Sequence, residues 1–253
     1  MVVGAHPDDE TAGAAGLLLR CERSNLWIVT VTDGAPRNPA DTERAGYTLR
    51  EDYAAARHQE LLNALAVAAV ATGHSHSLDI IDQEASFDMT ALAHRIAEIL
   101  RELRPTAVLT HPYEGGHPDH DATAFAVHAA CAMLTPPPEI YEFTSYHADP
   151  GKPRAMRVGH FLPGGDTGQL IPLSEKETEL KQKMFECYAS QAHMLRHFPL
   201  HEERFRAAPA YDFTEAPHAG TLFYENFPWG MTGDRWRQLA MESLSTLAIP
   251  ERV

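Results

Sequence analysis

Two short clusters of histidine and acidic residues lie far apart in the chain and could together hold a metal ion. The first is His6-Pro7-Asp8-Asp9-Glu10, and the second is His117-Pro118-Asp119-His120. Catalytic zinc sites take three protein ligands from His, Asp or Glu and leave one position for water. The two clusters offer more ligands than one such site needs, so they predict a divalent metal centre.

Each cluster follows a short apolar segment that is typical of a buried strand. Residues 1–5 precede the first cluster, and residues 106–110 precede the second. A helix is expected after each of them, from Asp8 or Asp9 to about Arg23 and from Pro118 or Asp119 to about Leu134. An acidic residue at a helix start can be only a cap, and 15 histidines make chance clustering easier. Two such clusters at strand ends nevertheless favour a metal site, because sites of parallel α/β folds lie there.

The chain alternates strands and helices up to about residue 135, which predicts a parallel sheet with helices on both faces. Further strands are expected at 26–32, which Asp33-Gly34 ends, and at 78–81, 140–145 and 157–162. Helices are expected at 49–70, 88–103, 174–195 and 236–247, with a loop at 35–47 and an irregular chain beyond 198. Ser174 and Glu177 form a capping-box pattern. The predicted fold class is α/β, with a Rossmann-like parallel-core sheet.

We expect residues 1–253 to form a single domain, with residues 1–195 as its core and 196–253 as a C-terminal cover. An aromatic run lies in this cover and comprises Phe223, Tyr224, Phe227 and Trp229. Packing on the core is the favoured interpretation of the run. The alternative is a pocket wall for a sugar ring or an acyl chain, which aromatic faces accommodate well.

The composition limits the class of partner. The net charge of −14 argues against nucleic-acid binding, which requires Lys and Arg to neutralise phosphates. The sequence contains neither an apolar run of membrane-spanning length nor a secretory signal. Three cysteines fit neither a disulfide framework nor a cysteine zinc site. We therefore expect a cytoplasmic protein that acts on a small molecule; the sequence leaves room for a homo-oligomer.

The two clusters resemble the paired signatures of the LmbE-like, or PIG-L, family of zinc-dependent de-N-acetylases. This family includes the deacetylases of N-acetylglucosaminyl-phosphatidylinositol and of the mycothiol and bacillithiol pathways. Residues 4–10 match the first signature and residues 117–120 match the second. Weaker matches are Arg57 with Glu60, and Ser190-Gln191 on a helix that contains Lys183. The resemblance runs from residue 1 to about residue 195.

The resemblance implies that His6, Asp9 and His120 hold Zn²⁺, although Fe²⁺ could take its place. Zinc lowers the pKa of bound water to about 7 and polarises a carbonyl, which suits hydrolysis of an unreactive amide. The ligand types alone do not exclude iron in such a deacetylase.

The resemblance also implies roles for the other polar residues. Asp8 is the general base toward the metal-activated water, a role that contributes roughly 10²–10⁴-fold. His117 stabilises the oxyanion or protonates the leaving amine, and Asp119 orients its ring. Arg57 is expected to contact the substrate.

The predicted function is therefore metal-dependent hydrolysis of an N-acetyl or similar acyl group on an amino sugar or related small molecule. One alternative is another metal enzyme, either a different small-molecule hydrolase or an iron oxygenase with a facial triad, whose barrel does not fit this pattern. A second alternative is a non-catalytic sugar-binding relative. Asp8 and His117 argue against it, because binding alone needs neither residue.

Overall fold

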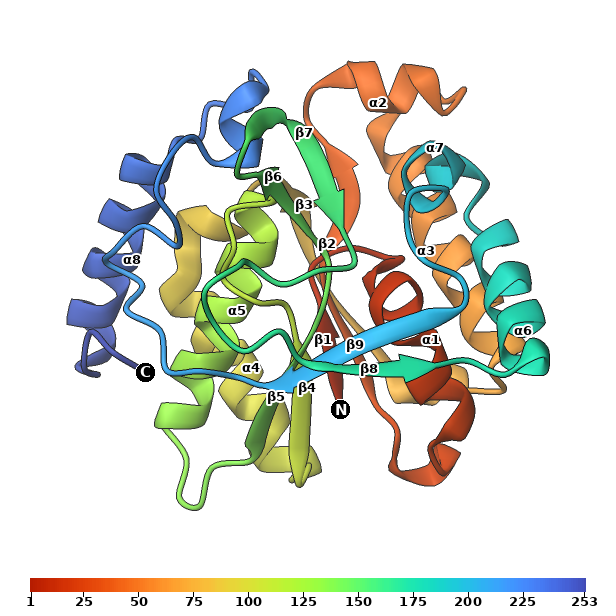
Figure 1. Cartoon of the computed structure of the whole chain (residues 1–253), viewed down its shortest axis with the longest axis horizontal. Coiled ribbons are helices and arrows are strands. Elements are labelled where there is room, and N and C mark those ends of the chain that lie inside the picture. The colour runs from red at the N-terminus through yellow and green to blue at the C-terminus, as the bar shows by residue number, and fades with distance from the viewer. The chain divides into compact units, whose positions relative to one another are not determined.

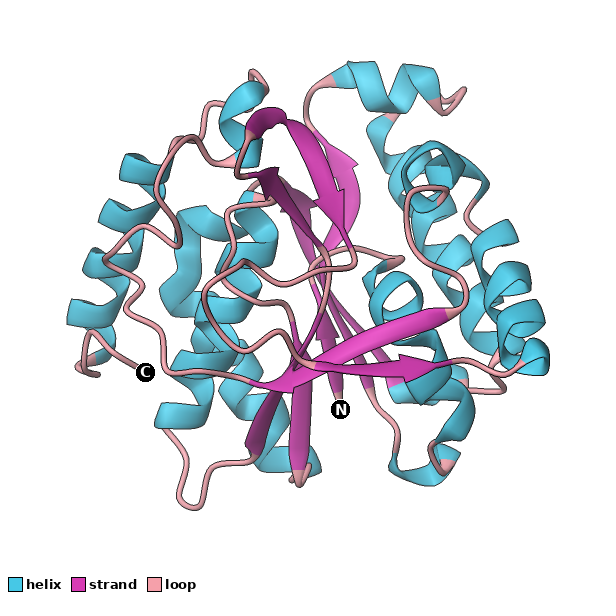
Figure 2. Ribbon diagram, in the orientation of Figure 1, coloured by secondary structure: helices cyan, strands magenta, loops and turns pink.

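The computed structural model describes residues 1–253, and the chain divides into two compact units. Unit 1 comprises Met1–Asp82 and Gln169–Arg204, and unit 2 comprises Gln83–Gly168 and Phe205–Val253. The main sheet has seven strands, most of them parallel, which confirms the predicted α/β class (Figures 1 and 2). The expectation of a single domain stays a prediction.

Unit 1 contains three adjacent parallel strands. β1 (Val2–Gly4) pairs with β2 (Ile28–Pro36), and β2 pairs with β3 (Ser75–Asp82). Helix α3 (Arg50–Val67) packs on β2, and α6 (Glu175–Glu186) packs on α3 and on α1 (Asp9–Arg20). The apolar side chains of β1 and β2 are almost all buried, as expected for strands covered on both faces.

A buried ion pair holds α1 and α6 together in unit 1. Lys181 is fully buried, and its Nζ donates to Glu203 Oε1 at 2.9 Å and to the carbonyl of Ala12 at 3.1 Å. The same carboxylate oxygen accepts the Gly16 amide at 2.9 Å. A Cβ at Gly16 would lie 2.4 Å from Leu173 Cδ2 and 2.9 Å from Glu203 Oε2, so any larger residue would displace these side chains. Charged groups thus replace apolar packing at the centre of this helix pair.

Unit 2 is built around one apolar helix. β4 (Ala107–Thr110) pairs in parallel with β5 (Glu139–Phe143), which pairs antiparallel with Phe205–Ala207, the end of β9 (Glu202–Ala207). Helix α5 (Pro118–Ala132) is buried on nearly all sides. It packs against α4 (Met89–Leu103) and α8 (Gly233–Leu247), which agrees with its lack of a polar face. A hairpin of β6 (Tyr146–Asp149) and β7 (Lys152–Val158) completes this unit.

Two predictions between residues 26 and 47 were wrong. β2 continues through Asp33-Gly34 to Pro36, because Gly34 adopts a φ of +66° without ending the strand. The expected loop at 35–47 contains helix α2 (Pro39–Arg44). Its start is specified by Asn38, whose side chain accepts the Ala40 amide at 3.1 Å, and by proline at the first helical position.

The later part of the chain was also predicted incompletely. The capping box at Ser174 is confirmed, but α6 ends at Glu186 and is followed by the short helices η4 (Ala189–Gln191) and α7 (Ala192–Leu195). The strand expected at 157–162 overlaps β7 by two residues only. β6, β8 (Gln169–Pro172) and β9 were not predicted, since they are short and carry charged or exposed residues. No helix is both long and apolar enough to span a bilayer.

Candidate active site

In unit 1, the first cluster lies at the carboxyl end of β1, where α1 begins. The backbone amide of His6 donates to Asp9 Oδ2 at 2.7 Å, and His6 Nδ1 lies 3.4 Å from the same oxygen. Both residues are buried, with exposures of 9% and 6%. A Cβ at Gly4 would lie 3.0 Å from the Asp9 Cβ, so the glycine of this motif allows the close turn. The turn fixes an imidazole and a carboxylate on one strand end.

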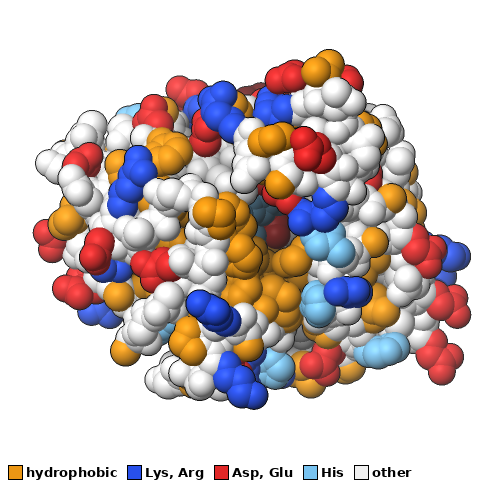
Figure 3. Space-filling view, turned by 90° about the horizontal axis from the view of Figure 1, so that it is seen from above, with side chains coloured by type: hydrophobic (Ala, Val, Ile, Leu, Met, Phe, Trp, Pro, Cys, Tyr) orange, Lys and Arg blue, Asp and Glu red, His pale blue; other side chains and the backbone are white.

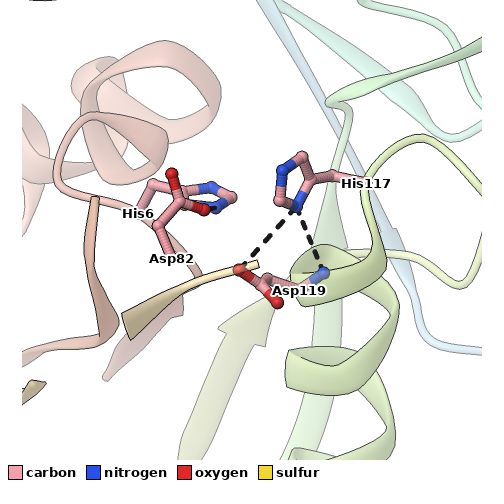
Figure 4. A group of neighbouring side chains, drawn as sticks. All are labelled: His6, Asp82, His117 and Asp119. Carbon is pink, nitrogen blue, oxygen red and sulfur yellow. Dashed lines mark hydrogen bonds and ion pairs between the residues drawn. The ribbon is translucent and has the colours of Figure 1, made fainter. Parts of the chain in front are cut away.

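Asp82 joins this group, although the sequence analysis did not select it. Its Oδ1 lies 3.1 Å from His6 Nε2, and Figure 4 shows the two side chains next to each other. Asp82 is the last residue of β3, so it emerges at the same edge of the parallel strands as His6. The available signal was its position as an acidic residue at the end of a predicted strand.

Asp8 is held by Arg57 from α3. Both terminal nitrogens of Arg57 lie 3.3 Å from Asp8 Oδ2, and the guanidinium side chain is only 3% exposed. Asp8 precedes α1 but makes no side-chain cap bond, so its carboxylate is committed to the arginine. Burial raises the pKa of Asp8 to about 6, while the charge of Arg57 opposes that rise. The structure therefore joins Arg57 to a carboxylate of the cluster.

The two weak sequence motifs meet behind this pair. Glu60 accepts the Ser190 amide at 2.9 Å and the Ser190 hydroxyl at 2.6 Å. Its Oε2 lies 4.0 Å from Arg57 Nη1. Gln191 donates to the hydroxyl of Tyr53 at 2.7 Å. Ser190 and Gln191 thus hold η4 against α3. A series of contacts also runs from Ser190 through Glu60 and Arg57 to Asp8.

Glu10 is held on a different set of partners. Its Oε1 accepts from the Tyr188 hydroxyl at 2.5 Å and from the Thr11 hydroxyl. Burial raises the pKa of Glu10 to about 7. Glu10 therefore links α1 to Tyr188, whereas His6, Asp8 and Asp9 supply the polar groups of the strand end.

In unit 2, the second cluster begins α5. His117 is the N-cap residue, and its Nδ1 accepts the Asp119 amide at 3.2 Å. A neutral His117 ring that accepts at Nδ1 carries its proton on Nε2. The Asp119 carboxylate accepts the amides of Gln83 at 2.6 Å and Ala85 at 3.1 Å, and lies 3.9 Å from His117 Nδ1 (Figure 4). The backbone amide of Asp119 therefore sets the orientation of the His117 ring, and the Asp119 carboxylate is held by the backbone of residues 83 and 85.

His120 follows one turn later and is 4% exposed. Its Nδ1 lies 3.2 Å from the Ser145 hydroxyl, and its ring stacks on His111 at 4.0 Å. A partner at one ring nitrogen is what metal-ligating histidines usually have, because it fixes the tautomer and the ring plane. The arrangement therefore prepares His120 to ligate through Nε2.

The loop before His117 is held by a buried carboxylate. Asp121 Oδ1 accepts the amides of Glu114 at 3.2 Å and Gly115 at 3.1 Å. Burial raises the pKa of Asp121 to about 8, although these two amides oppose the rise. The entry to α5 is thus organised by hydrogen bonds from the backbone.

The donor chemistry of both strand ends fits a divalent metal. In unit 1, His6, Asp9 and Asp82 offer an imidazole and two carboxylates, and in unit 2, His117, Asp119 and His120 offer two imidazoles and a carboxylate. In unit 1, the acidic residues Asp8, Asp9 and Glu10 follow His6-Pro7. Carboxylate oxygens are ordinary ligands of divalent cations. Two histidines with a carboxylate are also a common ligand set of catalytic zinc.

The chain was compared with known protein families and curated proteins. The family model PIG-L, described as GlcNAc-PI de-N-acetylase, matches residues 1–131. A Bacillus subtilis (strain 168) protein named "Probable N-acetyl-alpha-D-glucosaminyl L-malate deacetylase 2" is 32% identical over 132 residues, which are 50% of this chain and 58% of that protein. The chain thus spans little more than half the length of this curated relative.

Two solved structures share the fold. A crystal structure of the zinc-inhibited form of teicoplanin deacetylase Orf2 has a TM-score of 0.62 and 19% identity, covering 81% of this chain and 95% of that one. GalB, the 4-carboxy-2-hydroxymuconate hydratase of Pseudomonas putida KT2440, has a TM-score of 0.53 and 17% identity, with 81% and 94% covered. Because a deacetylase and a hydratase share it, this fold does not determine the reaction by itself.

Proposed function

Because the chain belongs to the PIG-L family, we propose that it is a metal-dependent hydrolase that removes an N-acetyl or similar acyl group from an amino sugar. The observation that carries the proposal is the pair of buried His and Asp clusters, both within the matched residues 1–131. A sugar-binding relative without catalysis would need neither the Asp8–Arg57 pair nor the oriented His117 ring.

The proposed metal ligands are His6, Asp9 and His120. Zn²⁺ is the proposed ion, and Fe²⁺ suits the same ligands. When bound, the ion supplies a Lewis acid that polarises the amide carbonyl and makes water more acidic. The contacts of His6 with Asp9 and of His120 with Ser145 orient the two imidazoles for this task.

Asp8 is the proposed general base, which accepts a proton from the attacking water. With a pKa of about 6, it is mostly ionised at neutral pH and still basic enough to accept a proton. Arg57 keeps its carboxylate in place through two hydrogen bonds. We therefore assign Arg57 to positioning Asp8, since its burial leaves little surface for a substrate.

His117 is the proposed donor to the carbonyl oxygen as that oxygen becomes negatively charged. Its Nδ1 accepts the Asp119 amide, so Nε2–H is the group available for donation. The same nitrogen can pass its proton to the leaving amine. Asp119 acts through His117 and does not contact the substrate.

The proposed partner is a small N-acylated amino sugar. The name of the Bacillus relative contains such a sugar, which supports this class. The net charge of −14 and the mixture of acidic and basic side chains on the face drawn in Figure 3 favour a small molecule over a nucleic acid. The three cysteines are unpaired, which supports a reducing, cytoplasmic location.

The test is amine release from a panel of N-acetylated amino sugars, together with metal analysis of the purified protein. We expect about one bound Zn²⁺ or Fe²⁺ per chain, loss of activity with a chelator and recovery with added metal. Asp8→Asn should keep the metal and lose turnover, and His6→Ala should lose both. A folded, metal-loaded protein that releases no amine from any member of the panel would refute the proposal.

A further inference from the structure

Three aromatic residues of unit 2 form a continuous group that the proposed mechanism does not use. We call Phe223, Phe227 and Trp229 the aromatic wall. Trp229 stacks on Phe227 with ring centroids 4.6 Å apart and planes 13° from parallel. Phe227 contacts Phe223 edge-on at 5.3 Å. The wall lies in the segment between β9 and α8, beyond the residues that the family model matches.

The wall is joined at both ends to the second cluster. Trp229 lies 4.8 Å from the His117 ring, and Phe223 lies 5.8 Å from Tyr146. Tyr146 in turn contacts His120 at 5.2 Å. His117 and His120 are themselves 5.3 Å apart, so the six rings form a closed circuit. The wall is therefore an extension of the candidate site within this unit.

Hydrogen bonds fix the segment that carries the wall. The Phe223 amide donates to the Gly115 carbonyl at 2.8 Å, in the loop that precedes His117. Glu225 accepts the amides of Leu222 and Gly233, each at 2.8 Å. Asn226 donates to the Pro153 carbonyl of β7 at 2.9 Å. A surface held in this way can bind a ligand without first being ordered.

The side chains of the wall become more exposed with distance from Phe223, the residue that is hydrogen-bonded to Gly115. Phe223 is 8% exposed, whereas Phe227 is 38% exposed and Trp229 is half-buried. Trp236 shows how a purely structural tryptophan differs in the same unit. It is fully buried, and its Nε1 donates to the Pro118 carbonyl at 3.1 Å. Trp229 has no hydrogen bond at its indole nitrogen and keeps part of its surface in solvent.

We propose that Trp229 and Phe227 bind the sugar ring of the substrate through its apolar C–H face. The inference rests on the proposed function, which names no residues that bind the sugar ring, and it assigns that role to the aromatic wall. Aromatic side chains offer apolar area with little rotamer entropy to lose, and the indole N–H can donate to a sugar hydroxyl. Contact with His117 places the bound ring beside the group proposed to donate to the amide.

Steady-state kinetics on the best amino sugar of the panel test the inference. Trp229→Ala should raise KM roughly tenfold, the loss expected for one aromatic contact, with kcat within about threefold of wild type. Trp229→Phe, which keeps a ring, should raise KM less. The matched control is Trp27→Phe. Like Trp229, Trp27 is half-buried and contacts a histidine, since its ring stacks on His74 at 4.2 Å, but it precedes β2 in unit 1 and lies outside the aromatic wall. Its KM should equal that of wild type.

A binding measurement separates this inference from the proposed hydrolysis. In Trp27→Phe the remaining tryptophans are Trp229 and the buried Trp236, so a change of emission on adding N-acetylglucosamine reports Trp229. We expect a saturable change that disappears in the double variant with Trp229→Phe. This titration tests ring binding even if wild type releases no amine.

Three results would overturn the inference. The first is an unchanged KM in Trp229→Ala. The second is an emission change that is absent in Trp27→Phe, or that survives in the double variant. The third concerns substrates with longer acyl chains. If wild type prefers them, and Trp229→Ala removes this preference without raising KM for the acetyl sugar, the wall binds the acyl chain instead of the sugar ring.

Discussion

The two units support their clusters by different means. In unit 1, two of the carboxylates are paired with side-chain cations, Asp8 with Arg57 and Glu203 with Lys181. In unit 2, Asp119, Asp121 and Glu114 accept hydrogen bonds from backbone amides. A backbone amide is kept by every substitution except proline, and it carries no full charge to neutralise the carboxylate. Asp8 and Glu203 in unit 1 should therefore be sensitive to the loss of a charged partner, whereas Asp121 and Glu114 in unit 2 should make stability depend on pH.

The largest effect is expected at Asp8, the proposed general base. Asp8→Asn keeps the shape of the side chain but cannot accept a proton, so kcat should fall by roughly 10²–10⁴-fold. Metal content, measured by mass spectrometry, should match wild type. An unchanged kcat would remove Asp8 from the mechanism. Loss of the metal would mean that its carboxylate serves as a ligand instead.

The next largest effect is expected on the stability of unit 1. Lys181→Met leaves Glu203 buried without its cation and should lower the free energy of unfolding by about 3–5 kcal/mol. Adding Glu203→Leu should restore most of this loss, because two apolar side chains can replace a buried ion pair. Urea denaturation measures both variants. If the double variant were no more stable than the single one, the ion pair would not be the cause.

The pH sensitivity of unit 2 can be tested at Glu114. Burial raises its pKa to about 8 in the folded chain, from 4.5 in the unfolded chain, and only one of its oxygens accepts a hydrogen bond, from the Leu162 amide at 2.7 Å. Between these two values the folded state binds a proton that the unfolded state has released. The contribution of Glu114 to the free energy of unfolding is therefore complete below pH 4.5 and is lost as the pH rises toward 8. The free energy of unfolding can therefore fall by up to about 1.4 kcal/mol per pH unit from this group.

Glu114→Gln mimics the protonated side chain and should flatten that slope. Unfolding free energies at several pH values between 5 and 8 would show it. The matched control is the double variant Lys181→Met/Glu203→Leu, which removes both charges of the buried pair in unit 1 and should leave the slope of the curve unchanged. A slope in Glu114→Gln equal to that of wild type would place the pH sensitivity elsewhere.

The sequence predicted the two strand ends well because their chemistry is local. Gly4, His6 and Asp9 form one turn, and His117 caps the helix that carries His120, so a few adjacent residues define each cluster. Helix α4 was predicted from its cap at Asp88 and from Pro105, which lies just beyond its end. Apolar strands covered on both faces, such as β2, were also recognisable.

The remaining features depend on contacts that no local pattern encodes. Asp82 belongs to the first cluster only because β3 lies parallel to β2. Strand β9 reads Glu-Glu-Arg-Phe-Arg-Ala, and its charged residues obtain partners such as Lys181 and Glu142 from distant segments. Substrate contact by Arg57 stays a prediction from the family resemblance, and its burial against Asp8 comes from tertiary packing that no local pattern indicates.

The smallest effect is expected at Ser190, which tests whether side-chain partners in unit 1 align Asp8. Ser190→Ala removes the 2.6 Å hydrogen bond to Glu60 but keeps the amide bond at 2.9 Å, so the stability should fall by only about 1 kcal/mol. If side-chain partners align Asp8, this loss should reach it through Glu60 and Arg57 and lower kcat a few-fold, with KM and metal content unchanged. The matched control is Ser145→Ala in unit 2, which contacts His120 and should act on metal affinity instead. A kcat in Ser190→Ala equal to that of wild type would limit the serine to fastening η4 on α3, and Arg57 alone would then be sufficient to hold Asp8.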